Sequence, residues 1–411
     1  MSFKDLKLNK PLLKAIAESG YDEPTLIQER CIPPILDKKN VIASAQTGTG
    51  KTAGFALPIL QLLSDKQDAP KRQKKIRSLI VSPTRELAVQ INENFKTYAK
   101  YTNLRSSVLF GGTSIEPQID ILKKGIDILI ATPGRLLDLH KQDYVNLDHV
   151  EVFVLDEADL MLDMGFIDDI KKIERLCPTH KQSLLFSATI PYKVEQLANS
   201  ILAEPIRIDV TPENSSISSI NQVLYYVPKR NKIELCLHLL RNTVKGRILI
   251  FRRTKFGVDK LEKTLLKNGY KADSIHGDKS QSDRQTALNK FKTGYVKILI
   301  ATDVAARGID ISELDAVINF DLPSVPETYI HRIGRTGRAG NIGAAFSLCS
   351  ADEKSYIKKI QEAINVQIPI ETEHPYPLDP KAKPIVHKKK GSKYKKGRKG
   401  SGSKKKKKRW Y

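Results

Sequence analysis

The first residues with the chemistry to hold phosphate groups lie at positions 45–52, which read Ala-Gln-Thr-Gly-Thr-Gly-Lys-Thr. Glycines let backbone N–H groups wrap a phosphate, and a helix that begins directly afterwards adds partial positive charge. Lys51 can reach the β- and γ-phosphates of a nucleotide, and the Thr52 hydroxyl can bind Mg²⁺. An apolar run precedes the glycines and a helical run follows them. That context favours a phosphate-binding loop over a plain glycine-rich turn, although Ala45 stands where the general pattern has its first glycine.

A second set of reactive side chains is acidic. Asp156-Glu157-Ala158-Asp159 directly follows the apolar run 152–155, and the carboxyl ends of such strands form the edge at which α/β sheets bind ligands. Asp156 could hold Mg²⁺, and Glu157 could polarise an attacking water as a general base. Alone, this stretch would be an ordinary acidic helix start, which the helix dipole favours. Together with the loop at 45–52, it predicts hydrolysis of a nucleoside triphosphate.

Buried strands must position both sets. Apolar runs that are short, continuous and rich in β-branched residues are typical of strands covered on both faces, and their alternation with helical stretches predicts parallel sheets with right-handed crossovers. In the first half these runs lie at 41–45, 79–83, 108–110, 128–131, 152–155 and 184–187, and in the second at 223–227, 248–251, 298–301, 317–320 and 344–347. The fold class is therefore α/β, with two such domains in tandem.

Composition divides the chain further. We expect a nucleotide-binding domain at 1–210, a polar linker at 211–219, a second domain at 220–368 and a disordered tail at 369–411 that is first Pro-rich and then Lys-rich. The formal net charge is +23, and the residues after 380 contain 16 basic and no acidic side chains. This balance indicates a polyanion partner, usually nucleic acid. A Lys-rich tail that only keeps the protein in solution is the alternative.

Several classes of protein are disfavoured. No apolar run approaches the ~18 residues of a membrane span, and the N-terminus lacks the apolar stretch of a secretory signal. The four cysteines form no CxxC pair, so neither a zinc site nor a disulfide framework is indicated. We expect a cytoplasmic protein.

The glycine-rich motif at 45–52 and the acidic motif at 156–159 together resemble those of the DEAD-box ATP-dependent RNA helicase family of superfamily 2. The resemblance extends from residue 3 to about residue 350. It implies two RecA-like domains, ATP and Mg²⁺ as cofactors, and RNA as the partner. The activity it implies is hydrolysis of ATP to ADP and phosphate, coupled to local unwinding of RNA duplexes or remodelling of RNA–protein complexes. The lean layout resembles the bacterial RhlE-type subgroup.

The resemblance also assigns the ATP site. Gly20 to Gln28 is similar to the family's adenine-reading Q motif, with Phe3 as the aromatic that lies against the base and Leu26 where proline is common. An amide offers the donor and acceptor that adenine requires, which predicts a preference for ATP over GTP. The implied cofactor-binding residues are Phe3, Tyr21, Thr25, Gln28, Ala45, Gln46, Thr47, Gly48, Thr49, Gly50, Lys51, Thr52 and Asp310. The implied catalytic residues are Lys51, Asp156, Glu157, His331, Arg335 and Arg338, with Arg338 as an arginine finger and with Thr52 and Asp156 as the metal ligands.

The remaining motifs are assigned to RNA and to coupling. Backbone contacts without base readout are expected from Pro83, Thr84, Arg85, Gly111, Gly112, Thr132, Pro133, Gly134, Arg135, Arg253, Gln281, Arg284 and Thr302. Ser187, Thr189 and Asp159 are expected to couple hydrolysis to strand separation. By itself, Gly111-Gly112 would be a strand-end turn, and Arg253 is equally well a phosphate contact or a solvated strand end. Arg332, Arg335 and Arg338 recur every three residues among glycines, which suits a phosphate-facing surface.

Two rival functions fit the same motifs. One is an RNA clamp or annealing protein gated by nucleotide that turns over little ATP; intact Lys51, Glu157 and Arg338 speak against it. The other is a translocating DNA helicase on the same scaffold, against which the chain lacks large inserted domains.

Overall fold

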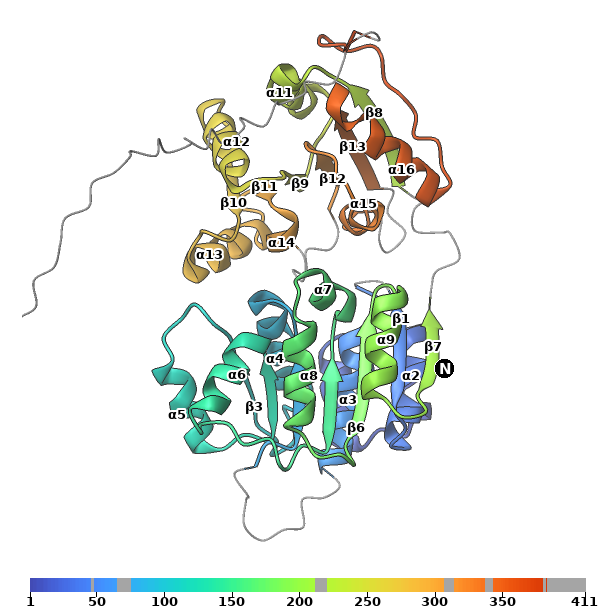
Figure 1. Ribbon diagram of the computed structural model, residues 1–411, viewed down its shortest axis with the longest axis vertical. Coiled ribbons are helices and arrows are strands. Elements are labelled where there is room, and N and C mark those ends of the chain that lie inside the picture. The colour runs from blue at the N-terminus through green and yellow to red at the C-terminus, as the bar shows by residue number, and fades with distance from the viewer. Residues whose placement is uncertain are drawn as a thin grey trace, which may run out of the picture.

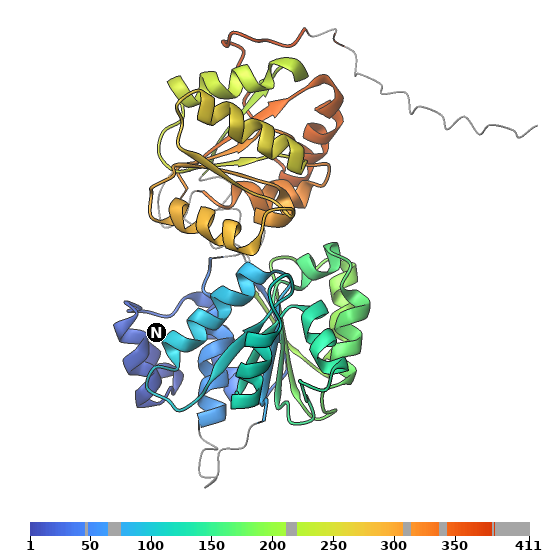
Figure 2. The same cartoon turned by 90° about the vertical axis from the view of Figure 1, so that its left-hand side faces the viewer.

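Two parallel β-sheets organise the chain, one in each half (Figure 1). The computed structural model describes residues 1–45, 48–64, 75–210, 220–306, 314–336, 343–379 and 382. The two halves lie one above the other, each a sheet with helices packed against it (Figure 2). The predicted linker at 211–219 lies outside the described residues.

The first sheet has seven strands in the order β3-β4-β2-β5-β6-β1-β7. They are β1 (Val41–Ala45), β2 (Ser78–Val81), β3 (Ser106–Leu109), β4 (Ile128–Ala131), β5 (Val152–Leu155), β6 (Gln182–Ser187) and β7 (Ile206–Val210). The helices of this half are α1 (Lys10–Glu18), α2 (Leu26–Leu36), α3 (Lys51–Ser64), α4 (Arg85–Tyr98), α5 (Glu116–Lys124), α6 (Pro133–Lys141), α7 (Ala158–Asp163), α8 (Ile167–Arg175) and α9 (Tyr192–Ile201), with a 3₁₀ turn η1 at Phe3–Leu6. Because β1, β2 and β5 are parallel and close in this order, the loops after them meet at one edge of the sheet.

The second sheet has six strands in the order β10-β11-β9-β12-β13-β8. They are β8 (Ile220–Tyr226), β9 (Ile248–Phe251), β10 (Ala272–Ile275), β11 (Ile298–Ala301), β12 (Ala316–Asn319) and β13 (Gly343–Cys349). The helices here are α11 (Lys232–Asn242), α12 (Lys255–Lys267), α13 (Gln281–Lys292), α14 (Asp303–Ala306), α15 (Pro326–Ile333) and α16 (Lys354–Ile364), with 3₁₀ turns η2 at Lys229–Asn231 and η3 at Ala351–Glu353.

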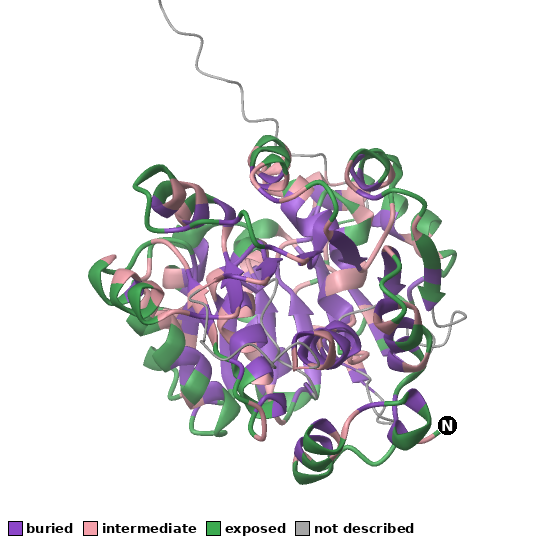
Figure 3. Ribbon diagram, turned by 90° about the horizontal axis from the view of Figure 1, so that it is seen from below, coloured by how far each residue is buried: buried purple, intermediate pink, exposed green. Residues whose placement is uncertain are grey.

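The central strands are buried on both faces. All residues of β2, β4, β5 and β6 are buried, as are those of β9, β11 and β12, and they form the inner layer of Figure 3. Separate apolar clusters cover the two faces of each sheet. The predicted α/β class with two tandem parallel-sheet domains is confirmed, as are the predicted strand runs.

The sequence did not predict two of the strands, β7 and β10. In β7 two of the first three residues are exposed, and β10 reads Ala-Asp-Ser-Ile, too polar and short to stand out. Both are edge strands. Edge strands need less apolar sequence because part of their surface meets solvent.

The prediction of disorder from residue 369 is wrong for the first part of that segment. Residues 369–379 run along the edge strand β8, where Leu224 donates to the Pro369 carbonyl at 2.8 Å and accepts from the Glu371 amide at 2.9 Å. Further on, Leu378 donates to the Tyr226 carbonyl at 3.0 Å. We call residues 369–379 the strap. An edge strand offers unpaired backbone groups, and the fixed φ of proline suits an extended partner, so this Pro-rich stretch is ordered by pairing.

Candidate active site and nucleic-acid interface

The phosphate-binding loop joins β1 to α3 as predicted. Gly48 and Gly50 have positive φ values of 85° and 90°, a conformation that side chains other than glycine rarely adopt. A Cβ on Gly50 would lie 2.4 Å from Nε2 of Gln28, so that position requires glycine. Ala45 is the last residue of β1, and Gln46 and Thr47 lie outside the described residues.

Gln28 ties the N-terminal helices to this loop. Its side-chain oxygen accepts from the Thr25 amide at 3.0 Å, and its Nε2 donates to the Gly50 carbonyl at 3.2 Å. Thr25 and Gln28 form a capping box at the start of α2. Because an amide carries further donor and acceptor capacity, Gln28 can support the loop and still contact a base.

The structure gives the two predicted aromatics of the base site different environments. Phe3 is only 5% exposed and belongs to the apolar core of the first domain, so its visible role is packing. Tyr21 is 43% exposed, and its hydroxyl lies 3.3 Å from that of Tyr98. Of the two, Tyr21 has the ring surface that a base could contact.

The acidic stretch and the lysine of the loop meet across 106 residues of sequence. Lys51 Nζ donates to Glu157 Oε1 at 3.0 Å, and both side chains are less than 10% exposed. Glu157 adopts a left-handed conformation with φ 55° and ψ 54°, which is uncommon for a residue with a side chain and tends to occur at functional sites. The backbone therefore turns sharply after Asp156 and aims the Glu157 carboxylate at the lysine.

Charge in this cluster is unbalanced. Asp156, Glu157 and Asp159 are buried around Lys51, the one cation that the described residues place among them. Burial and the neighbouring carboxylate of Glu157 raise the pKa of Asp156 to about 7, against the opposing effect of Lys51. For Lys51, burial lowers the pKa, but the three carboxylates outweigh burial and the net pKa is raised. A divalent cation carried in with phosphates would relieve the excess negative charge.

The donors available suit Mg²⁺, which usually takes one or two carboxylates together with water and substrate phosphates. Asp156 follows β5, and Thr52 lies in the first turn of α3 beside the loop. The described residues contain no group of three or more His, Cys, Asp or Glu side chains placed to hold an ion. An ion at this site would be held by Asp156 and Thr52 in company with the nucleotide.

The predicted coupling residues are in contact. Thr189 donates to Asp159 Oδ2 through both its amide, at 3.1 Å, and its hydroxyl, at 3.0 Å. The Asp159 amide donates to the Ser187 hydroxyl at 3.1 Å. The end of β6 is thereby fastened to the first turn of α7, directly after Glu157.

A cleft collects most of the predicted RNA contacts. Its volume is about 560 Å³, and it is lined by Pro83, Thr84, Arg85, Glu86, Gly111, Thr132, Gly134, Arg135, Asp138, Met164, Phe166, Arg284 and Val304. Gly112 belongs to the same surface, because the Arg85 guanidinium lies 2.3 Å from where its Cβ would be. Pro133 is buried as the first residue of α6, and Thr302 immediately precedes α14. The loops after β2, β3 and β4 thus converge on one surface.

Cations dominate this cleft. Burial lowers the pKa of Arg85, and the nearby Arg284 and Arg135 act in the same direction while Glu86 opposes them. Arg135 Nη1 and Arg284 Nε are buried without a hydrogen-bond partner among the described residues, although Arg135 Nη2 donates to the Thr113 carbonyl and Arg284 Nη2 pairs with Glu86. Unsatisfied guanidinium donors beside one another favour an anion such as a phosphate.

Glu86, which the sequence analysis missed, joins the two domains inside the cleft. It accepts from Gln281 Nε2 at 3.0 Å and pairs with Arg284 Nη2 at 3.0 Å, and its side chain is 2% exposed. Gln281 and Arg284 belong to α13, on the side of the second domain that faces the first (Figure 1). In the sequence, Glu86 has only the signature of an acidic residue in the first turn of a helix, so its partner could not be read there.

The first of the three predicted arginines, Arg332, lies near the end of α15 and makes its contacts inside the domain. Arg332 is 2% exposed and binds Asp303 through Nε at 2.6 Å and Nη2 at 2.8 Å. The expectation of a continuous phosphate-facing surface is therefore wrong for Arg332, because its guanidinium is consumed inside the domain. His331 lies on the same helix and Arg335 is buried just beyond it. Arg338 and Asp310 lie outside the described residues.

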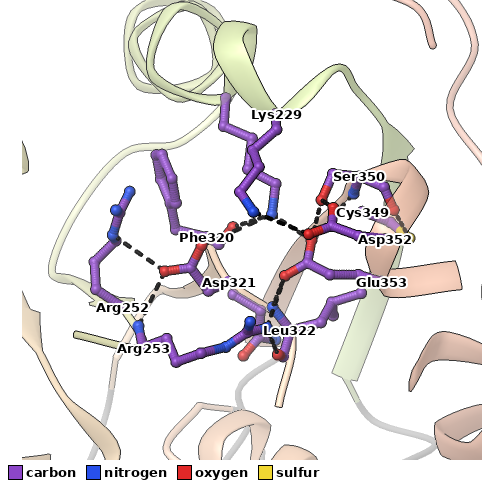
Figure 4. A network of polar contacts seen from close by, with 12 residues as sticks. Lys229, Arg252, Arg253, Phe320, Asp321, Leu322, Cys349, Ser350, Asp352 and Glu353 are labelled. Atoms are coloured by element: carbon purple, nitrogen blue, oxygen red, sulfur yellow. Dashed lines mark hydrogen bonds and ion pairs between the residues drawn. The ribbon is translucent and has the colours of Figure 1, made fainter. Parts of the chain in front are cut away.

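Arg253 is paired rather than solvated at its strand end. Its Nη2 donates to Glu353 Oε1 at 3.1 Å and to the Leu322 carbonyl at 2.9 Å. Figure 4 shows it in a polar network in which Glu353 also binds Lys232 Nζ at 2.5 Å. Almost half of the Arg253 side chain is exposed, so both its pairing and a phosphate contact can be tested by substitution.

Family models match both halves of the chain. The model described as DEAD/DEAH box helicase matches residues 25–197, and the model described as Helicase conserved C-terminal domain matches residues 231–340. No helix among the described residues is long and apolar enough to cross a bilayer.

Curated relatives are similar over most of their length. The chain is 42% identical to the DEAD-box ATP-dependent RNA helicase RhpA of Helicobacter pylori over 367 residues, 89% of this chain and 73% of the relative. It is also 42% identical to the DEAD-box ATP-dependent RNA helicase CshA of Bacillus subtilis, over 88% of this chain and 72% of that protein. Neither carries the RhlE name, so that subgroup stays a prediction.

Solved structures share the fold. Dbp5 of S. cerevisiae, bound to RNA and ADP BeF3, superposes with a TM-score of 0.79 at 32% identity and covers 90% of this chain and 95% of its own. Mss116p bound to single-stranded RNA and AMP-PNP gives a TM-score of 0.82 at 32% identity. The match covers 91% of this chain and 79% of the Mss116p chain. The predicted tandem RecA-like architecture is confirmed.

Proposed function

The chain belongs to the DEAD-box ATP-dependent RNA helicase family, and on that premise we propose that it hydrolyses ATP to open RNA duplexes locally or to remodel RNA–protein complexes. The observation that carries the proposal is the meeting of two sites in one molecule. The Lys51–Glu157 pair lies at the carboxyl edge of the first sheet, and an arginine-lined cleft crosses from the first domain to the second.

The ion pair between Lys51 and Glu157 engages the ammonium group that a nucleotide phosphate would contact. A phosphate that reaches Lys51 competes with Glu157 for the same ammonium group. Once displaced, the carboxylate is free to accept a proton from an attacking water, the role of a general base. Nucleotide binding itself therefore prepares the base.

Mg²⁺ belongs to the proposed reaction as a charge-neutralising partner of the phosphates, with Asp156 and Thr52 to hold it. When bound, it would stabilise charge on the transferring phosphoryl group. Arg335 and Arg338 are the groups of the second domain that we propose for the same charge, with His331 and Asp310 as supporting contacts. Thr25, Gln28 and Tyr21 would select adenine.

RNA would bind through its backbone. One donor nitrogen each of Arg135 and Arg284 that is unpaired among the described residues, and the loops at Thr84, Gly111 and Gly134, offer donors to phosphates, which position a strand without reading its sequence. Because Gln281 and Arg284 reach Glu86 across the interface, the complete cleft requires closed domains. ATP and RNA would then favour the same closed arrangement and strengthen each other's binding.

Asp159 can transmit a structural change at the ATP site to the end of β6. It follows Glu157 by two residues and holds Thr189 at the end of β6 by two hydrogen bonds. A movement of Glu157 on phosphate release would act directly on that strand end.

The four free cysteines are all buried, which supports the reducing, cytoplasmic location that we propose.

The deciding experiment measures ATP hydrolysis and duplex opening with the full chain. We expect RNA to stimulate hydrolysis, and a short RNA duplex to open with ATP but not with a non-hydrolysable analogue. Lys51→Ala serves as the control that lacks the phosphate contact. Equal stimulation by DNA would favour the translocating DNA helicase, and RNA binding with negligible turnover would favour the clamp.

A further inference from the structure

Phe256 is the most exposed of the large apolar side chains among the described residues, at 76%. It is the second residue of α12, and nothing in the proposed ATP or RNA sites uses it. A lone exposed apolar residue is ordinary, but this one lies at the end of α12 that contacts the loop leading to Gln281 and the cleft.

The backbone beneath Phe256 is held firmly. Thr254 caps α12 by accepting from the Gly257 amide at 3.1 Å. A Cβ on Gly257 would lie 2.5 Å from the Arg252 guanidinium, which is stacked at 4.0 Å on the Phe320 ring and paired with Asp321 at 3.2 Å. The ring is therefore presented to solvent from a rigid base, so it would lose little freedom on contact with a ligand.

Two contacts tie this end of α12 to the loop that leads into the cleft. Lys255 Nζ pairs with Asp278 Oδ2 at 2.5 Å, and His276 Nε2 lies 2.8 Å from Asp259 Oδ1. The loop continues to Gln281, whose side chain reaches Glu86. Phe256 thus stands at the outer end of a continuous surface that begins in the arginine-lined cleft.

The charges around the ring suit a nucleic acid. Lys255 Nζ lies 5.6 Å from the centroid of the ring, and the first turn of α12 contains no acidic residue. The two nearby carboxylates that the structure describes, Asp278 and Asp259, are in contact with Lys255 and His276, which reduces their repulsion of a phosphate. Aromatic side chains beside cationic grooves commonly stack on unpaired bases.

We propose that Phe256 stacks on an unpaired base of the RNA strand where that strand leaves the cleft on the second domain. This contact adds base-dependent affinity to binding that otherwise rests on the backbone. It tolerates every base, because each has a π-face, and purines gain most from their larger area. The inference rests on the proposed RNA function.

The test compares two strands of equal length in one salt, with a non-hydrolysable ATP analogue present. One is a short oligoadenylate and the other has the same sugar-phosphate backbone with abasic internal positions. Phe256→Ala and Phe256→Leu should each weaken binding of the oligoadenylate by about five- to tenfold. Neither variant should change the affinity for the abasic strand. Phe256→Tyr should bind like the parent protein, because it keeps the aromatic face.

A direct readout uses Phe256→Trp together with Trp410→Phe, since Trp410 is the one tryptophan of the chain. Oligoadenylate should quench its fluorescence, and the abasic strand should not. If Phe256→Leu binds oligoadenylate like the parent, or if Phe256→Ala weakens both strands equally, stacking is disproved; a ring that serves a protein partner would give the first result. A parent protein that binds neither strand would instead contradict the proposed function.

Discussion

The two domains have the same kind of sheet but arrange their buried charges differently. Among the described residues of the first, three buried carboxylates surround one lysine. In the second, Lys232 contacts Glu353, which also pairs with Arg253, and Arg332 contacts Asp303 at two points. An excess of buried carboxylates favours the binding of charged ligands, whereas oppositely charged groups with further hydrogen bonds hold a scaffold in place. On the proposed function, the first domain would be the reactive half and the second a rigid surface that closes on it.

The largest effect should follow a change in the unbalanced cluster. Glu157→Gln removes the base but keeps a similar shape, so ATP binding should remain while hydrolysis falls by about 10²–10⁴-fold. Steady-state and single-turnover ATPase assays would measure it. A loss of less than about tenfold would remove Glu157 from the base role. The Glu157→Gln variant should also stay bound to RNA, because without hydrolysis the closed state would no longer return to the open state.

A matched pair should instead affect stability. Glu353→Gln removes the nearer of the two carboxylates beside the buried Lys232, leaving Asp321 at 3.9 Å, and it also removes the charged partner of Arg253. The free energy of unfolding should fall by about 3 kcal/mol. Urea unfolding of the full chain would show it as an earlier transition of the second domain, with nucleotide binding by the first domain retained. Asp352→Asn is the matched control, because its pair with Lys229 is far more exposed and should contribute at most about 1 kcal/mol.

The interface between the halves should respond more mildly. Glu86→Gln weakens the contact with Arg284, so the RNA concentration for half-maximal stimulation of ATPase should rise about tenfold, equivalent to ~1.4 kcal/mol. ATP affinity without RNA should not change. Glu93→Gln, an exposed position on the same helix, controls for charge alone. Partial recovery of the half-maximal RNA concentration in the double variant Glu86→Arg with Arg284→Glu would establish the pair. If the Glu86→Gln variant behaves like the parent protein and the double variant shows no recovery, the pair has no role.

The strap should show the smallest effect, and it depends on pH. Burial lowers the pKa of His374 below its usual 6.5, and His238 adds to this while Glu371 opposes it. Since the folded pKa is depressed, the stabilisation is present above pH 6.5 and is lost as the pH falls through the folded value. Protection of the Glu371 and Leu378 amides from exchange, measured relative to an unstructured peptide at the same pH, should therefore fall between about pH 7 and pH 5. His374→Gln should abolish that dependence; an unchanged dependence would place the titration elsewhere.

Local patterns were enough for the buried strands and for the proposed catalytic motifs, but not for the edge strands β7 and β10 or for the strap. A phosphate-binding loop needs only a buried strand, glycines with positive φ and a helix start, all within about a dozen residues, and these are written in the sequence around Lys51. Asp156 and Glu157 were predicted for the same reason, because they directly follow an apolar strand. The loops after β2, β3 and β4, which we propose to contact RNA, were likewise recognisable as polar ends of apolar runs.

Only the tertiary structure decided which side chains became partners. Lys51 and Glu157 meet across 106 residues because β1 and β5 lie close in the sheet. Glu86 meets Arg284 across 198 residues because the domains face each other there, and Arg332 turned inward because Asp303 lay within its reach. The type of a charged residue is written in the sequence, but its partner depends on strand order and domain packing. These bring distant segments together, and the sequence near each residue does not encode them.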